Sequence, residues 1–200
     1  MLQNIKWLGH AGFKITGEKT IYIDPFKINE TEPADIIICT HEHFDHVSHE
    51  DIKKIQAGKT VIVTTPDCYS KVSGNVKTLS VGQSIVVDGI KIEGVPAYNL
   101  NKNFHPKSNN WIGVVITVNG KRIYHAGDTD NIPEMAALKN IDIALLPVSG
   151  TYVMTAEEAA DAANKIMPKI AVPMHYGSII GTKADAERFR KLCKCKAEIL

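Results

Sequence analysis

The segment Thr40-His41-Glu42-His43-Phe44-Asp45-His46 carries four potential metal ligands within six residues. It directly follows residues 35–40, an Ile-rich apolar run that predicts a buried strand, so a short loop can turn several side chains toward one point. Imidazole nitrogen and carboxylate oxygen suit Zn²⁺ and similar divalent ions, and a ligand set without thiolate leaves coordination positions for water. The pattern therefore favours a catalytic metal site. The alternative, surface polar residues after a strand, requires this dense cluster to arise by accident.

Outward from this segment, short apolar runs alternate with turns and with a few helical patterns. The predicted buried strands are residues 21–23, 35–40, 60–65, 141–148 and 170–173. Asp88-Gly89 and Asn119-Gly120 are tight-turn dipeptides that predict two hairpins.

Helices are predicted to begin after Ser48 and after Thr155, and to cover residues 184–192. Thr155 and Glu158 form a capping-box pattern, and that helix is expected to end before Pro168. The strand-and-hairpin pattern followed by strand-helix units indicates two related halves. We therefore expect two stacked sheets with helices outside, in a single domain of residues 1–200.

Composition excludes several classes of protein. The 200 residues are 44% hydrophobic, enough for a substantial core, and no apolar run approaches the ~20 residues of a membrane span. A net charge of +1 predicts no strong attraction to nucleic acid or to a membrane surface. The first residues lack a signal-peptide pattern, and the four cysteines are expected to be reduced thiols, so we expect a cytoplasmic protein. The sequence specifies no oligomeric state.

The pattern His41-x-His43-x-Asp45-His46 resembles the signature of the metallo-β-lactamase superfamily. Further segments are similar, in the same order, to a small branch of it that includes ascorbate-6-phosphate lactonase-like and uncharacterised Zn-dependent hydrolases. These segments are residues 7–13, 21–26, 124–129 and 172–176. The resemblance implies an α/β (α+β) fold, a four-layer αββα sandwich of two mixed β-sheets with helices outside.

The resemblance also implies a dinuclear ligand set. His41 and His43 match ligands of the first metal, and Asp45, His46 and His175 match those of the second. Asp128 resembles the acidic residue that bridges both ions, and Asp24 resembles an acid that supports the site from beneath.

The third ligand of the first metal has two candidates. Relatives commonly place a His soon after a Val-Pro-Ala segment, whereas this chain has Tyr98 and Asn99 there. We assign His105 through a longer loop, and the alternative is that Asn99 or water fills the position.

Four other residues have both a functional and a structural interpretation. His10 lies in the segment of residues 7–13, which resembles an opening strand of the family, and is either a pocket residue or a structural histidine. His125 lies three residues before Asp128 and is expected to orient it by hydrogen bonding. Tyr152 and Tyr176 either contact substrate or pack at strand ends.

The resulting hypothesis is a metal-dependent hydrolase that acts on a small-molecule substrate. Two divalent cations, with Zn²⁺ as the default and Mn²⁺ or Fe²⁺ as alternatives, would share a water and lower its pKa from ~15.7 toward neutrality. Asp45 would orient the resulting hydroxide for attack on a lactone, a phosphodiester or a related ester. The competing hypotheses are a non-catalytic metal-binding or sensing protein and a diiron redox protein on the same fold.

Overall fold

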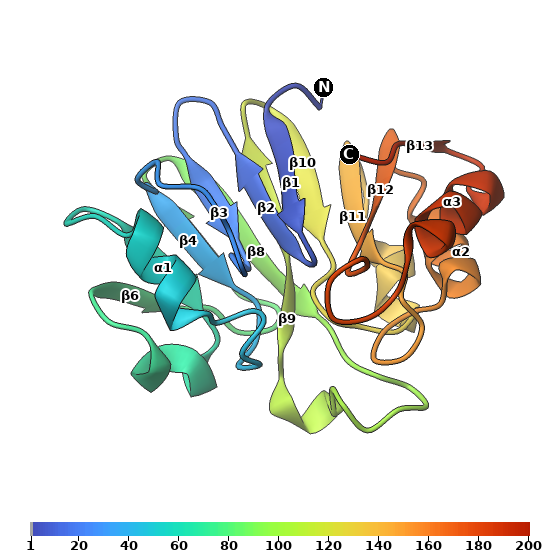
Figure 1. Cartoon of the computed structure of the whole chain (residues 1–200), viewed down its shortest axis with the longest axis horizontal. Coiled ribbons are helices and arrows are strands. Elements are labelled where there is room, and N and C mark those ends of the chain that lie inside the picture. The colour runs from blue at the N-terminus through green and yellow to red at the C-terminus, as the bar shows by residue number, and fades with distance from the viewer. Residues whose placement is uncertain (1) are drawn as a thin grey trace.

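In the computed structural model, which describes residues 2–200, two mixed β-sheets pack against each other (Figure 1). The first sheet has the strand order β1-β2-β3-β4-β5-β6, with antiparallel pairs from β1 to β3 and parallel pairs from β3 to β6. Its strands are β1 Ile5–Gly9, β2 Gly12–Ile15, β3 Ile21–Ile23, β4 Ile36–Cys39, β5 Val61–Thr64 and β6 Asn75–Thr78.

The second sheet has the order β13-β12-β11-β10-β9-β8-β7 and repeats this design. Strands β7 to β10 form an antiparallel meander, and β10 to β13 pair in parallel. Its strands are β7 Ser84–Val87, β8 Ile90–Pro96, β9 Ile112–Val118, β10 Lys121–His125, β11 Ile143–Pro147, β12 Ile170–Met174 and β13 Lys196–Ala197. The shared order, antiparallel strands followed by parallel ones, agrees with the two related halves that the sequence indicates.

The helices cover the outer faces of the two sheets, α1 on one side and α2 and α3 on the other (Figure 1). They are α1 His49–Ile55, α2 Ala156–Ile166 and α3 Lys183–Leu192, and the 3-10 turns are η1 Pro66–Lys71, η2 Lys107–Asn109 and η3 Pro133–Ala137. The Thr155 side chain accepts from the Glu158 amide and completes the expected capping box of α2. The layers therefore confirm the predicted αββα sandwich. Within residues 2–200, none of the helices is both long and apolar enough to cross a membrane.

Strand β4 shows how the sequence produces these layers. Its side chains alternate between the two faces of the sheet. Ile36 and Ile38 join the core between the sheets, whereas Ile37 packs in the cluster under α1 with Ile52 and Ile55. Because both faces are covered, a continuous Ile-rich run is favoured over an alternating one.

The candidate site residues follow strands at one edge of both sheets. Asp24 follows β3, residues 41–46 follow β4, Asp128 follows β10 and His175 follows β12. Parallel strands bring their carboxyl ends to the same edge of a sheet, so two facing sheets place all these loops together. In Figure 1 the loops lie along the lower side, away from the two chain ends.

Gly113 on β9 provides a test of the packing at this edge. A Cβ atom there would lie 2.6 Å from the Ala126 carbonyl oxygen and 2.8 Å from that of His125. Gly113→Ala is expected to lower the free energy of unfolding by about 1–3 kcal/mol, because the backbone of β10 must shift. Urea denaturation measures this loss. The control Gly58→Ala, whose Cβ meets no atom within 4 Å, is expected to change stability by less than about 0.5 kcal/mol. Equal stabilities of the two variants would contradict the prediction.

Candidate metal centre

Three histidines form the first group of potential ligands. His41 and His43 come from the loop after β4, and His105 comes from the loop between β8 and β9. One ring nitrogen from each lies within 4.8 Å of the others. His41 Nε2 and His43 Nδ1 are 3.0 Å apart, so the two rings direct nitrogen atoms to one point. The side chains match the set expected for a first metal.

Asn99, the alternative candidate for the third ligand, uses its side chain in hydrogen bonds within the protein. Its Oδ1 atom accepts from the His105 amide at 2.9 Å and lies 3.1 Å from His105 Nδ1, and its Nδ2 atom donates to Asp130 and to the Tyr152 carbonyl. The amide is thus fully used in holding the loop. His105 lies in the group with His41 and His43.

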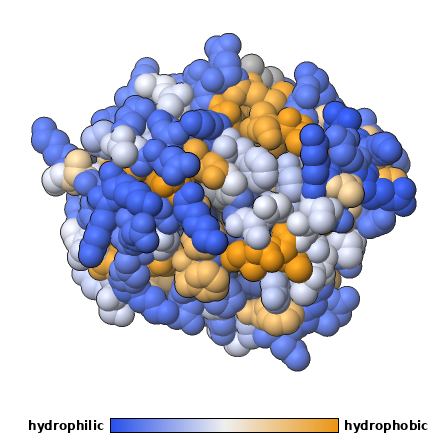
Figure 2. All heavy atoms as spheres, viewed as in Figure 1, coloured by the Kyte–Doolittle hydropathy of each residue, from blue (hydrophilic) through white to orange (hydrophobic). Residues whose placement is uncertain are grey.

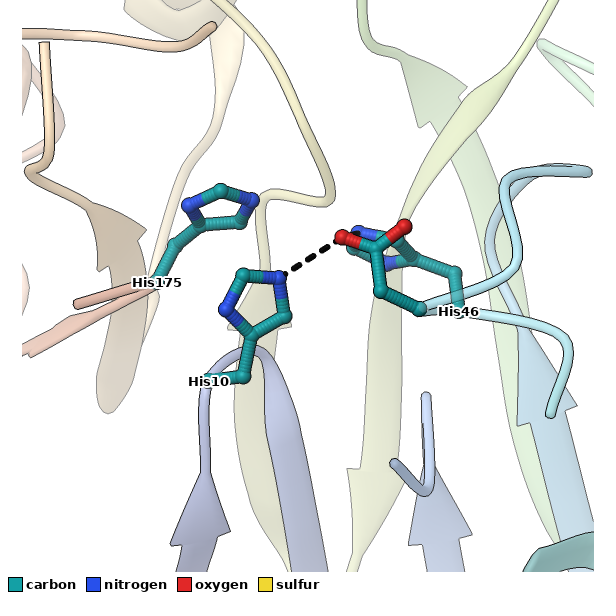
Figure 3. A group of neighbouring side chains, drawn as sticks. His10, His46 and His175 are labelled. Carbon is teal, nitrogen blue, oxygen red and sulfur yellow. Dashed lines mark hydrogen bonds and ion pairs between the residues drawn. The ribbon is translucent and has the colours of Figure 1, made fainter. Parts of the chain in front are cut away.

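The second group contains His10, Asp45, His46 and His175 (Figure 3). His10 lies in the turn between β1 and β2, and its Nε2 atom is 2.8 Å from Asp45 Oδ2, the contact drawn as a dashed line. His175 follows β12 in the opposite sheet, and its Nδ1 atom is 3.0 Å from Ser149 Oγ. Residues from loops of both sheets therefore form the site. His10, for which the sequence left two interpretations, is buried within this group.

Asp128 lies between the two groups. Its Oδ2 atom is 3.3 Å from His105 Nε2 and 3.0 Å from His175 Nε2, and its Oδ1 atom is 3.4 Å from His46 Nε2. A carboxylate in this place can contact two cations and balance part of their charge.

The fully buried Asp24 carboxylate supports the centre from beneath. It accepts hydrogen bonds from the Thr40 amide at 2.8 Å and the Thr40 hydroxyl at 2.7 Å, and it lies 2.7 Å from His46 Nδ1. A proton on Nδ1 leaves His46 Nε2 free to act as a ligand. The sequence did not predict a functional role for Thr40, although this residue directly precedes the first histidine of the motif.

Three residues of the centre have a left-handed backbone. The φ angles are +50° at His10, +44° at Asp24 and +59° at His175, a conformation that costs a non-glycine residue roughly 1–2 kcal/mol. The His175 amide donates to the His10 carbonyl at 2.8 Å and ties a loop of one sheet to a loop of the other. This contact compensates part of the strain and fixes the two imidazoles beside each other.

The contact expected for His125 differs in the structure, and Tyr176 follows one of its two interpretations. His125 does not hydrogen-bond Asp128: its Nε2 atom donates to the Ala11 carbonyl at 2.8 Å, and its Nδ1 atom accepts from the Gly127 amide at 3.2 Å. It holds the backbone next to Asp128 rather than its carboxylate. The Tyr176 ring stacks on Trp7 with centroids 4.7 Å apart and belongs to the core. Packing explains Tyr176, because its ring fills space between strand ends.

A pocket of about 220 Å³ opens onto the centre. The potential ligands in its wall are His43, Asp45, His105, Asp128 and His175, and the other lining side chains are Phe44, Phe104, Tyr152 and Ile179. A larger, mainly apolar cavity of about 420 Å³ shares Trp111 with the surroundings of His41 and His43 but contains none of the candidate ligands. The smaller pocket is therefore the candidate active site.

The protein's own charges favour a cation here. Burial lowers the pKa of His41 well below its ordinary value, which keeps that ring neutral. Burial opposes ionisation of Asp128, but His175 and His46 outweigh it and hold the pKa of this carboxyl well below its usual range. Burial also opposes charge on His46, yet Asp128 and Asp24 hold its pKa well above the ordinary value. The buried carboxylates thus attract positive charge to this point.

Comparison with known proteins decides the family. Residues 4–175 match the family described as the β-lactamase superfamily domain. A UPF0173 metal-dependent hydrolase of Thermococcus onnurineus is 36% identical, over 98% of this chain and 94% of that protein. The chain belongs to the UPF0173 family of metal-dependent hydrolases, within the metallo-β-lactamase superfamily.

Solved structures of this superfamily have the same architecture. A Parabacteroides distasonis protein classed among metal-dependent hydrolases is 36% identical, with a TM-score of 0.88 over 98% of this chain and 91% of that one. A Thermotoga maritima protein classed as a Zn-dependent hydrolase of the metallo-β-lactamase superfamily is 25% identical, with a TM-score of 0.68 over 98% and 96%. The family resemblance expected from the sequence is confirmed.

Unpaired buried atoms test whether a metal fits this UPF0173 site. Within residues 2–200, five buried side-chain nitrogen or oxygen atoms have no hydrogen-bond partner, and four of them belong to His10, His46, His105 and Asp128. Buried polar atoms without partners are costly and rare. Three of the four are candidate ligand atoms that lie close together. They are Asp128 Oδ1 and the Nε2 atoms of His46 and His105, both of which face the Asp128 carboxylate. Divalent cations would supply the missing partners, so the residues fit a metal centre.

Asp24→Asn tests the support beneath His46. The amide accepts less strongly than the carboxylate and presents its own donors, so His46 loses a fixed orientation. We expect metal affinity to fall about 10- to 100-fold, measured by competition with a chromophoric chelator. The control Asp88→Asn, in an exposed hairpin turn with φ +48°, should retain the original affinity. Unchanged affinity in folded Asp24→Asn would contradict the assigned role.

Proposed function

We propose that this metal-dependent hydrolase cleaves an ester-type bond, in a lactone, a phosphodiester or a related ester, at a centre of two divalent metal ions. The observation that carries the proposal is the place of Asp128 between two groups of ligands, each with at least three ligand atoms within 4.8 Å of one another. Two adjacent sites joined by a carboxylate are typical of dinuclear hydrolytic centres.

Each residue has a role in this proposal. His41, His43 and His105 would hold one ion, Asp45, His46 and His175 would hold the other, and Asp128 would contact both. When bound, two such ions would supply a water of lowered pKa and a Lewis acid for the substrate's carbonyl or phosphoryl oxygen. Asp45 directs the attacking water, and His10 holds the Asp45 carboxylate through the 2.8 Å contact. The pocket gives substrate access to the centre, which supports catalysis over a closed, purely structural metal site.

The donor set supports zinc as the ion. Imidazole nitrogens and carboxylate oxygens suit Zn²⁺, and Mn²⁺ and Fe²⁺ share this preference. We also propose a cytoplasmic location, which the four free cysteines support because thiols persist in a reducing compartment.

Metal content tests the dinuclear arrangement directly. Protein purified without chelator or affinity-metal resin is expected to contain about two ions per chain by elemental analysis, since there are two ligand groups. His105→Ala is expected to lower the content toward about one, because the first group keeps two imidazoles. The control His49→Ala removes an exposed imidazole of α1 and should leave the content unchanged. A content near zero after reconstitution with Zn²⁺ or Mn²⁺ would refute the proposal.

Asp45→Ala tests catalysis separately from folding. The variant is expected to lower kcat at least about 100-fold on any substrate that the protein hydrolyses, because the attacking water loses its orienting carboxylate. Steady-state kinetics measure the loss, with metal content determined on the same samples. The control Glu50→Ala removes a highly exposed carboxylate of α1. Near-normal turnover of Asp45→Ala with intact metal content would exclude this role.

A further inference from the structure

Hydrophobic side chains surround the entrance to the candidate active site. Phe44, Phe104 and Ile179 line the pocket, yet their exposed fractions are 70%, 47% and 40%. The Phe104 ring packs edge-on against Tyr152, with centroids 4.7 Å apart. Figure 2 shows hydrophobic residues over the loops that follow β4 and β12, in the lower middle of this face. Large exposed apolar groups that converge on a pocket mark a binding surface.

Cationic side chains are absent from this wall. Among the described residues that line the pocket, none is Lys or Arg. Lys102, on the same loop as Phe104, is mostly buried and donates to Asp130 at 2.7 Å. Lys27 lies over the Phe26 ring, 5.1 Å from its centroid. Protein sites for phosphate groups often use Arg and Lys for charge and hydrogen bonds, so this wall adds nothing to the binding of a phosphodiester beyond what the proposed metal ions would supply.

We infer that the substrate is an uncharged carboxylic ester or lactone with a short apolar acyl group, an inference that rests on the hydrolytic function proposed above. The acyl group contacts Phe44, Phe104 and Ile179, and the carbonyl faces the ligand cluster at the pocket floor. The volume of about 220 Å³ is below the ~300–1,000 Å³ of sites for drug-sized ligands, which favours a short chain.

The reaction is a simple hydrolysis. The oxygen of water forms a bond to the carbonyl carbon, and the bond from that carbon to the alkoxy oxygen breaks. One proton of the water goes to the leaving alcohol and the other is released as the carboxylic acid ionises. No oxidant, reductant or second substrate is required.

A series of p-nitrophenyl esters measures the contribution of the apolar wall. Metal-loaded protein is assayed with the acetate, butyrate and hexanoate esters and with bis(p-nitrophenyl) phosphate. We expect kcat/KM to rise about fourfold for each methylene from acetate to butyrate, because each enters the apolar wall. The hexanoate ester shows whether the gain in kcat/KM continues for an acyl chain longer than butyrate. The phosphodiester is expected to be the poorest substrate.

Matched variants locate the effect. Phe104→Ala is expected to remove most of the gain from acetate to butyrate, because its ring forms the wall without supplying a ligand. The control Tyr69→Ala removes an exposed aromatic ring, 56% accessible, that does not line the pocket, and should preserve the gain. A second readout is calorimetric binding of butyrate and acetate to the metal-loaded protein, in which butyrate should bind more tightly in wild type than in Phe104→Ala.

The outcomes separate the two proposals. Hydrolysis of esters with no gain from chain length, or faster cleavage of the phosphodiester, overturns the inferred substrate class and leaves the hydrolytic function intact. Absence of turnover on every ester and on the phosphodiester counts against the hydrolytic function instead. In that case the binding of acetate and butyrate still tests the apolar wall. Equal affinity for the two would contradict an apolar wall at the pocket.

Discussion

The buried carboxylate of Asp24 is the contact on which the geometry of the centre depends. A carboxyl group without solvent requires hydrogen-bond partners, and Asp24 finds them in the backbone and hydroxyl of Thr40 and in His46. These donors lie at the end of β4, where the ligand segment begins. The same hydrogen bonds that satisfy the carboxylate therefore set the path of the loop after β4 and the orientation of its last imidazole.

Convergence of two sheets explains why the ligands come from distant parts of the chain. Each sheet ends its parallel strands at the same edge, and packing of the sheets brings the two edges together. The hydrogen bond from the His175 amide to the His10 carbonyl fixes this junction at the centre itself. Strained backbone at both residues is maintained because the surrounding core leaves little freedom for relaxation. The candidate ligands of this centre are thus held by contacts within the protein itself.

The sequence predicted much of this arrangement because the motif is local. Residues 41–46 lie in one turn after an unmistakably buried strand, so their proximity requires no knowledge of the rest of the fold. The place of His105 depends on a long loop, which Asn99 holds through hydrogen bonds that no local pattern reveals. The strand β6 was missed because its Asn75–Thr78 segment is polar and largely exposed at a sheet edge. His125 and Tyr176 show the opposite limit, since a position within three residues of a candidate ligand does not determine where their side chains point.

The segment after β4 combines polar and apolar side chains whose physical requirements differ. His43 and Asp45 are polar groups of the pocket, whereas Phe44 between them is exposed and apolar. The turn itself is closed by backbone hydrogen bonds from the His46 and Val47 amides to the His43 carbonyl, both 2.9 Å long. Because these bonds do not involve the Phe44 side chain, the pocket wall can change at this residue while the turn that presents the ligands is preserved. Under the proposed function, the loop would separate selection of substrate from assembly of the metal centre, although adjacent residues would perform the two tasks.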